Sequence, residues 1–226
     1  SNKKFSIRNI PKICSGVTKN CSIVTQKIYS KIANKIVTVS NIETAEFTKI
    51  FENLYRSVNI ALVNEMKTIC KKLGLDIHEI ISAAKTKPFG YEAFYPGPGV
   101  GGHCIPIDPF YLSWLAKKNK INLKFIELSG KINDFISKWI ISNSFKNNFN
   151  KVLLVGAAYK KNVDDPRESP IFNFIDILSK KKIKIDYHDP HVQKLESRKL
   201  KKVFYSKKIN STMLGKYDLI YIITDH

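Results

Sequence analysis

A segment rich in glycine and proline restricts the fold of this 226-residue chain more than any other feature. Residues 96–109 read PGPGVGGHCIPIDP, with four glycines and four prolines in fourteen positions. Proline fixes its own φ and lacks a backbone donor, while glycine lets the backbone come close to other groups. Because neither a regular helix nor a regular strand suits this composition, we predict a tight and rigid loop.

One cysteine, Cys104, lies inside this loop, and Asp108 follows it by four residues. A thiol held in a rigid loop can act as a nucleophile, and a carboxylate close to it can move protons or orient a water molecule. A second interpretation fits the loop equally well, because a free cysteine is commonly a small buried side chain that only packs. The loop alone leaves both interpretations open.

Three segments of the chain, in the same order, resemble one protein family. Residues 101–109 resemble the catalytic loop of the UDP-glucose/GDP-mannose dehydrogenase family, residues 45–65 its central helix, and residues 156–170 the entrance to its nucleotide-sugar domain. The resemblance covers nearly the whole chain from Pro11 onward. His103 and Ile107 stand where the UDP-glucose and GDP-mannose enzymes usually carry serine and lysine, and this resembles the UDP-N-acetylhexosamine 6-dehydrogenase branch.

The resemblance implies an α/β protein with three parts. The family begins with an NAD-binding βαβ unit that carries Gly-x-Gly-x-x-Gly, and no such fingerprint opens this chain. We therefore expect residues 1–40 to be the end of a truncated NAD-binding Rossmann domain. Residues 41–148 would form an all-helical central dimerisation domain with the catalytic loop, and residues 149–226 an incomplete Rossmann-like UDP-sugar-binding domain with a parallel sheet.

Apolar periodicity predicts the individual elements. A β-α-β piece is expected within residues 10–39, and a long amphipathic helix from the cap at Ser40-Asn41 to Gly74. Three shorter helices are expected after the long one. A strand, a helix and a second strand are expected near the C-terminus, with a further strand after them, and this order of elements favours a parallel sheet. The helices are 77–84, 109–117 and 125–143; the sheet unit comprises strand 151–156, helix 170–181, strand 183–187 and strand 218–224.

Lys49 and Asn53 are four residues apart on the long helix, so they project from one face and could share an oxyanion. A solvated lysine beside an exposed asparagine is the simpler interpretation of the same spacing. The resemblance implies catalysis: Lys49 would stabilise the alkoxide and the tetrahedral oxyanion, and Asn53 would bind the same oxygen or the hydrolytic water. Cys104 would be the nucleophile, and Asp108 would assist the water that releases the acid.

Aromatic and glycine residues before the thiol could line a sugar pocket, although a plain surface cluster would show the same pattern. The candidates are Tyr91, Phe94, Tyr95 and Gly101. Lys160 and Arg167 stand beyond the end of a strand, where open α/β sheets bind ligands. The resemblance assigns Lys160 to the diphosphate of the substrate. It leaves Arg167 open between substrate, cofactor and a salt bridge with Asp164 or Asp165.

The formal net charge of +19 would permit binding to nucleic acid or to an anionic membrane. The lysines are scattered, however, and no nucleic-acid-binding motif accompanies them, so we expect neither partner. No apolar run reaches the roughly 18 residues of a membrane span, and no signal peptide is apparent, which predicts a cytoplasmic protein. His103 beside Cys104 is a poor chelating pair, so we expect no metal.

The resemblance implies an NAD-dependent enzyme that oxidises C6 of a UDP-N-acetylhexosamine to the uronic acid for surface polysaccharide. The expected partner is a second copy, bound through the apolar face of the long helix. Without the dinucleotide fingerprint, this chain is expected to be inactive alone. The alternatives are an inactive fragment that binds only UDP-sugar or a partner subunit, and a basic nucleic-acid-binding protein.

Overall fold

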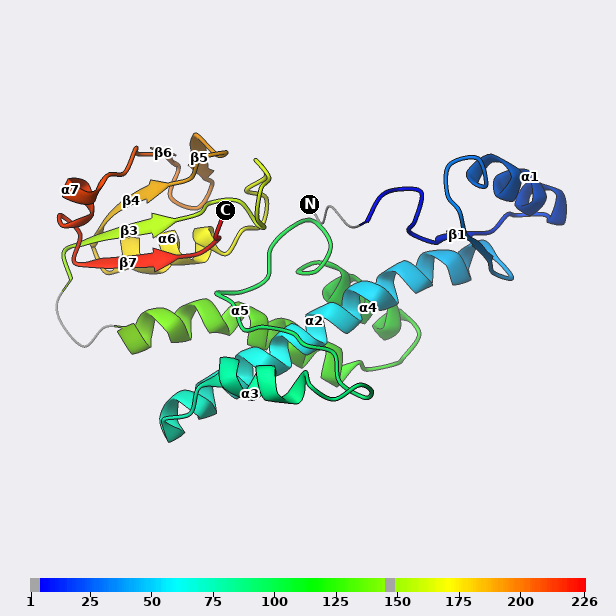
Figure 1. Cartoon of the computed structure of the whole chain (residues 1–226), viewed down its shortest axis with the longest axis horizontal. Helices are drawn as coiled ribbons and strands as arrows, with labels where there is room; N and C mark the ends of the chain where they lie inside the picture. Colours follow the sequence, from blue (N-terminus) through cyan, green and yellow to red (C-terminus); the bar gives the residue numbers. More distant parts are fainter. Residues whose placement is uncertain (1–4, 145–148) are drawn as a thin grey trace. The chain divides into compact units, whose positions relative to one another are not determined.

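The computed structural model describes residues 5–144 and 149–226. The chain divides into two compact units, one up to Asn53 and one from Leu54 onward. Figure 1 shows the order of the elements along the chain. The predicted boundary between residues 148 and 149 adjoins residues 145–148, which lie outside the described part of the chain. The three predicted domains are therefore still a prediction.

The first unit contains the expected β-α-β piece. Strands β1 (Lys12–Cys14) and β2 (Ile36–Thr38) pair in parallel, and helix α1 (Lys19–Tyr29) connects them. The hydroxyl of Thr18 caps α1 by accepting a hydrogen bond from the backbone N–H of Cys21, at 3.2 Å. A parallel pair joined by a helix is the unit from which Rossmann domains are built.

The long helix α2 (Ile42–Leu73) follows the prediction closely. Its start is set by Asn41, whose side-chain oxygen accepts from the backbone N–H of Thr44 at 2.7 Å. Gly74 ends it with a φ of +73°, the left-handed conformation that glycine adopts at little cost. The boundary between the two units falls within α2.

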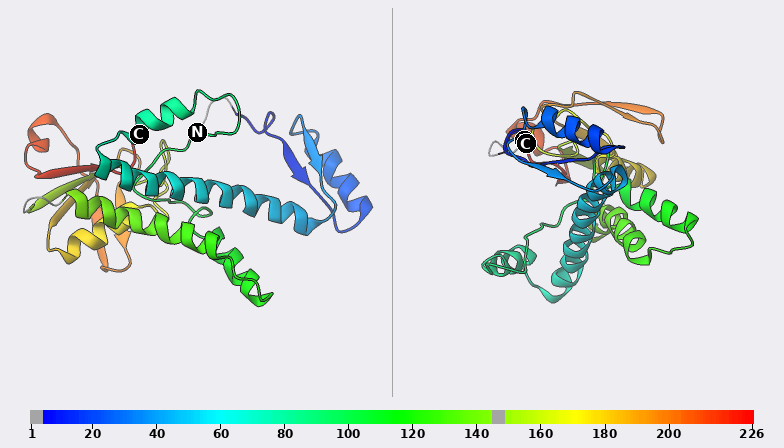
Figure 2. Two further views of the ribbon diagram at one scale, coloured as in Figure 1. Left: turned by 90° about the horizontal axis from the view of Figure 1, so that it is seen from below. Right: turned by 90° about the vertical axis from the view of Figure 1, so that its right-hand side faces the viewer.

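Three further helices confirm the predicted helical section. Helix α3 (Ile77–Ala84) is capped by Asp76, helix α4 (Asp108–Lys118) has a proline in its first turn, and helix α5 (Lys124–Ser144) leads toward the sheet. The second half of α2 and α5 run side by side (Figure 2), and buried amide side chains join them. Helix α4 begins one residue earlier than expected.

The C-terminal sheet is parallel, as predicted, with the strand order β4-β3-β7. Its strands are β3 (Lys151–Val155), β4 (Lys184–His188) and β7 (Leu219–Ile222), and helix α6 (Ile171–Lys180) connects β3 to β4. The sequence did not predict the antiparallel hairpin of β5 (Lys194–Ser197) and β6 (Lys202–Tyr205), or the short helix α7 (Ser211–Leu214).

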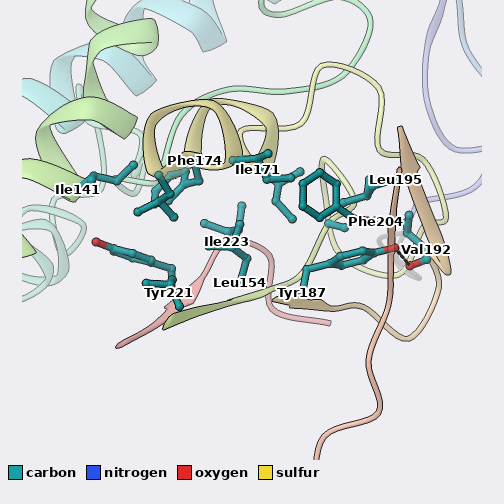
Figure 3. Packing of buried hydrophobic residues seen from close by; sticks show 14 of the residues in the cluster. Ile141, Leu154, Ile171, Phe174, Tyr187, Val192, Leu195, Phe204, Tyr221 and Ile223 are labelled. Atoms are coloured by element: carbon teal, nitrogen blue, oxygen red, sulfur yellow. Dashed lines mark hydrogen bonds between the residues drawn. The ribbon is translucent and has the colours of Figure 1, made fainter. Parts of the chain in front are cut away.

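The main core lies between this sheet and α6 (Figure 3). Leu154 of β3 and Phe174 of α6 are fully buried, and the rings of Phe174 and Tyr221 meet edge to face at 5.1 Å. Ile141 of α5 is also fully buried in this cluster, which anchors the helical section to the sheet. Across residues 5–144 and 149–226, no helix combines the length and apolar character needed to cross a membrane.

Candidate functional site

The predicted loop connects α3 to α4 and places Cys104 on the surface. Cys104 is exposed, so its interpretation as a small buried side chain is wrong. Its carbonyl oxygen accepts from the backbone N–H groups of Ile107 and Asp108, at 3.0 and 2.8 Å. This turn brings the backbone of Asp108, the first residue of α4, against the backbone of Cys104.

Three hydrogen bonds hold the glycine-rich part of the loop. The backbone N–H of Gly97 donates to the side chain of Asn64 at 2.9 Å, and the hydroxyl of Ser137 donates to the carbonyl of Pro98 at 2.5 Å. The N–H of Gly102 donates to the carbonyl of Arg167 at 3.2 Å. Because the partners come from α2, α5 and the segment before α6, the loop is fixed from several sides.

Sequence reasoning missed the buried polar residues behind these bonds. Asn133 of α5 donates to the backbone carbonyl of Ser57 at 2.9 Å and accepts from the amide of Asn64 at 3.3 Å. All three residues are buried, and buried polar groups are costly unless they are paired. The spacing of seven residues between Ser57 and Asn64, on the inner face of an amphipathic helix, was a usable signal.

The loop also packs directly against the sheet domain. A Cβ atom at Gly101 would lie 2.9 Å from Cβ of Tyr159 and from the carbonyl oxygen of Glu168, and one at Gly102 would lie 2.8 Å from the ring of Tyr159. Gly102 also has a φ of +89°, which side chains rarely adopt. Close packing therefore accounts for both glycines, and substrate binding by Gly101 stays a prediction.

Lys49 and Asn53 lie on α2 in the first unit, whereas Cys104 and Asp108 lie in the second. The Lys49 side chain is 64% exposed and pairs with Glu52 at 3.0 Å. Asn53 is 3% exposed, so the interpretation of it as an exposed asparagine is wrong. That both residues act on the same oxygen as Cys104 stays a prediction.

The predicted aromatic residues have different environments. Phe94 packs against a small core of α2 and α3 residues and meets the ring of Tyr55 at 5.7 Å. The ring of Tyr95 stacks on His78 at 6.3 Å, and Tyr95 and Tyr91 are both exposed. These contacts give Phe94 a packing role and leave the two tyrosines on the surface, where a sugar could reach them.

Lys160 and Arg167 lie in the segment that follows β3, at the carboxyl edge of the sheet. The Lys160 ammonium is exposed and lies 5.1 Å from the centre of the Tyr159 ring. Arg167 makes a forked ion pair with Asp165, with N–O distances between 2.6 and 3.0 Å, which selects Asp165 from the two predicted salt-bridge partners. The guanidinium holds the pKa of Asp165 below its usual range, with a smaller contribution from His103 of the loop.

A helical section joined to a parallel sheet, with basic residues at the carboxyl edge, defines an α/β protein of the kind that binds a ligand at that edge. The model of the UDP-glucose/GDP-mannose dehydrogenase family's central domain matches residues 43–135, and the model of its UDP binding domain matches residues 153–226. The chain belongs to this family.

Curated relatives in the family include UDP-N-acetylhexosamine dehydrogenases. A UDP-N-acetyl-D-mannosamine dehydrogenase of Methanococcus vannielii is 35% identical over 95% of this chain and 49% of its own length. A UDP-N-acetyl-D-glucosamine 6-dehydrogenase of Salmonella typhi is 31% identical over 99% of the chain and 54% of its own length. The chain thus spans about half the length of the curated relatives it matches.

Solved structures show the same arrangement of elements. The structure of a UDP-D-ManNAc dehydrogenase from Pyrococcus horikoshii aligns with a TM-score of 0.81 and 28% identity, over 97% of this chain and 51% of that one. A UDP-N-acetyl-mannosamine dehydrogenase from Staphylococcus aureus aligns with a TM-score of 0.77 and 30% identity, over the same shares. The predicted fold class and family are confirmed.

Proposed function

We propose that this chain forms the central and UDP-binding parts of an NAD-dependent UDP-N-acetylhexosamine 6-dehydrogenase that supplies uronic acids for surface polysaccharide. The observation that carries the proposal is an exposed thiol, Cys104, on a loop hydrogen-bonded to the segment that follows β3 of the sheet domain. A nucleophile fixed beside a nucleotide-sugar domain could act on the sugar while the nucleotide anchors the substrate. The names of the relatives support the same substrate class.

In the proposed reaction, the C6 alcohol is oxidised to an aldehyde and then to a carboxylate. The Cys104 thiolate adds to C6 of the aldehyde and forms a C–S bond, which gives a thiohemiacetal. After the second oxidation the adduct is a thioester, and water attacks its carbonyl carbon, which breaks the C–S bond and returns the thiol. Asp108, whose backbone N–H donates to the carbonyl of Cys104, accepts a proton from that water.

Other residues would bind the substrate and stabilise charge. Lys49 would offset the negative charge that develops on the C6 oxygen, and Asn53 would donate a hydrogen bond to it or to the water. The exposed ammonium of Lys160 would contact the diphosphate. Tyr91, Phe94, Tyr95 and Gly101 would line the sugar pocket.

NAD would supply the hydride acceptor for both oxidations. Among the described residues, however, the turn between β1 and α1 carries Gly16 but no Gly-x-Gly-x-x-Gly, so it does not fit the pyrophosphate of a dinucleotide. We therefore assign cofactor binding mainly to a part of the protein outside this chain, with Arg167 as a candidate contact. The proposed compartment is the cytoplasm, where free thiols stay reduced.

The proposed protein partner is a second copy of the chain, bound along α2. Large apolar side chains recur at helical spacing on this helix and are exposed, which is costly on a monomer of this size. A homodimer through this face would bury them. The exposed residues are Phe47, Phe51, Tyr55, Leu62, Met66, Ile69 and Leu73.

Calorimetry of the chain with UDP, UDP-N-acetylglucosamine, UDP-glucose and NAD tests the proposal. We expect UDP-sugar binding, strongest for the acetamido sugar, and no NADH formation. Lys160→Ala should weaken UDP binding about tenfold, since it removes one charge from the diphosphate. Lys184→Ala is the matched control, because it removes the same charge at the amino end of β4, on the opposite edge of the sheet.

Two results would contradict the proposal. Equal UDP affinity in Lys160→Ala and Lys184→Ala would show that Lys160 does not contact the diphosphate. NAD binding tighter than UDP-sugar binding would show that the dinucleotide site lies within this chain.

A further inference from the structure

A buried carboxylate joins the loops that follow two neighbouring strands. Asp189, just after β4, is 1% exposed. One of its oxygens accepts from the backbone N–H groups of Ala157 and Ala158, at 2.5 and 3.1 Å, and the other accepts from those of His191 and Val192, at 2.7 and 2.8 Å. Although burial alone would raise the pKa of Asp189, these four donors lower it below its usual range, so the group is a carboxylate.

His226 connects this carboxylate to the loop that carries Lys160. Its side chain is 9% exposed; Nε2 lies 2.9 Å from the Asp189 carboxylate, and Nδ1 lies 3.1 Å from the backbone nitrogen of Asn162. A backbone N–H can only donate, so Nδ1 must accept. The proton therefore sits on Nε2, which donates to Asp189, and the hydrogen-bond network defines the tautomer.

The segment that ends in His226 holds the same loop at two more points. The hydroxyl of Thr224 donates to the carbonyl of Ala158 at 2.6 Å, and Asp225 makes an ion pair with Lys161. Residues 157–162 are thus tied at their start to Asp189 and at their end to His226. Lys160 lies between these two attachments.

We propose that Asp189 and His226 are positioning residues that hold the 157–162 loop so that Lys160 meets the diphosphate of a UDP-sugar. This inference rests on the proposed function. Neither side chain needs to touch the ligand: the carboxylate sets the start of the loop, and the imidazole sets the backbone of Asn162, two residues after the lysine. Fixing the lysine before binding lowers the entropy that the complex loses.

Two substitutions separate the two bonds of His226. The substitution His226→Asn places an oxygen acceptor near the position of Nδ1 and so keeps the hydrogen bond from the backbone N–H of Asn162. Gln places an amide donor near the position of Nε2 and so keeps the bond to Asp189. Because Asp189 retains four other donors, we expect His226→Asn to bind UDP within about twofold of the unaltered chain and His226→Gln to bind about tenfold more weakly.

The experiment is calorimetry of the chain with UDP and with uridine, in which the variants are combined with Lys160→Ala. Because uridine lacks the diphosphate, its affinity should be the same in all variants. Unchanged uridine affinity, together with an unchanged circular dichroism spectrum, verifies that each variant is folded. In the Lys160→Ala background, His226→Gln should cause no further loss of UDP affinity, whereas a residue with only a structural role would give additive losses.

Two outcomes are distinguishable. If the unaltered chain does not bind UDP, or binds it independently of Lys160, the proposed function fails and the inference fails with it. If UDP binding depends on Lys160 but is equal in the Asn and Gln variants, or if the Gln and Lys160→Ala losses add, the inference alone is overturned.

Discussion

Gly156 gives the most specific stability prediction. It follows β3 with a φ of +85°, and a Cβ atom there would overlap the carbonyl oxygen of Thr224 and lie 2.6 Å from the Thr224 nitrogen. Gly74, at the end of α2, has a similar φ of +73°, but a Cβ atom there would meet nothing within 4 Å. The pair Gly156→Ala and Gly74→Ala therefore separates the cost of the backbone conformation from the cost of the collision.

The magnitudes follow from these two environments. An alanine at positive φ costs roughly 1–2 kcal/mol, and the loss of chain entropy in the unfolded state returns up to about 1 kcal/mol. Gly74→Ala should thus lower the free energy of unfolding by about 1 kcal/mol or less. Gly156→Ala must also displace Thr224, which strains the bonds from Ile223 N–H to Val155 and from the Thr224 hydroxyl to Ala158. We expect a total cost of about 3–5 kcal/mol.

Thermal unfolding followed by near-ultraviolet circular dichroism would measure the difference. At about 2–4 °C per kcal/mol for a chain of this size, Gly156→Ala should lower Tm by about 10 °C and Gly74→Ala by no more than about 4 °C. Equal shifts in the two variants would refute the reasoning. They would mean that the residues after β7, Ile223 and Thr224, move away from the added methyl group without losing their hydrogen bonds.

Three further predictions concern chemistry and pH. In the proposed full-length dehydrogenase, Cys104→Ser should abolish acid production, because a serine hydroxyl at this position does not ionise readily; near-normal turnover would contradict the proposed role of Cys104 as nucleophile. Lys49→Ala should lower kcat by roughly two to three orders of magnitude with a smaller change in KM, and an effect on KM alone would assign Lys49 to ground-state binding. Burial and a hydrogen bond to Asp186 raise the pKa of Tyr217 to about 12 from about 10 in the unfolded chain. The stability that this group contributes is complete below pH 10 and is lost as the pH rises toward 12. The free energy of unfolding of Tyr217→Phe, measured with urea, should therefore be about 1 kcal/mol lower than that of the unaltered chain at pH 8. Between pH 9 and 11 the variant should lose less stability than the unaltered chain, and equal losses in the two would contradict the pKa shift.

Elements with a strong local signal were predictable from the sequence. Helix α3 was predicted from its apolar periodicity with the bounds that the structure shows, and the structure adds a cap at Asp76 that marks the same start. Strand β3 was predictable as a short apolar run that ends at a glycine. The β5–β6 hairpin was missed because its sequences, KLES and KVFY, alternate over only four residues each and carry lysines.

The contacts that hold the candidate site were less predictable, because they join residues far apart in the sequence. Asp189 follows a strand and precedes a proline, which by itself indicates only a turn. Its partners Ala157 and His226 lie 32 and 37 residues away. Likewise, the glycines of the Cys104 loop predicted irregular backbone, but the sequence did not show that Tyr159 would fill the space that Gly102 leaves.

The packing of Gly102 against Tyr159 links the two halves of the proposed site. Tyr159 stands immediately before Lys160, and its backbone N–H donates to the carbonyl of Asp165 at 2.9 Å. The same segment continues to Arg167, whose carbonyl accepts from Gly102 two residues before Cys104. One short segment after β3 therefore contacts the loop that carries Cys104 and also carries Lys160, the residue proposed to contact the diphosphate. A displacement of this segment would move Lys160 and the Cys104 loop together, because a few backbone contacts within one unit connect the two.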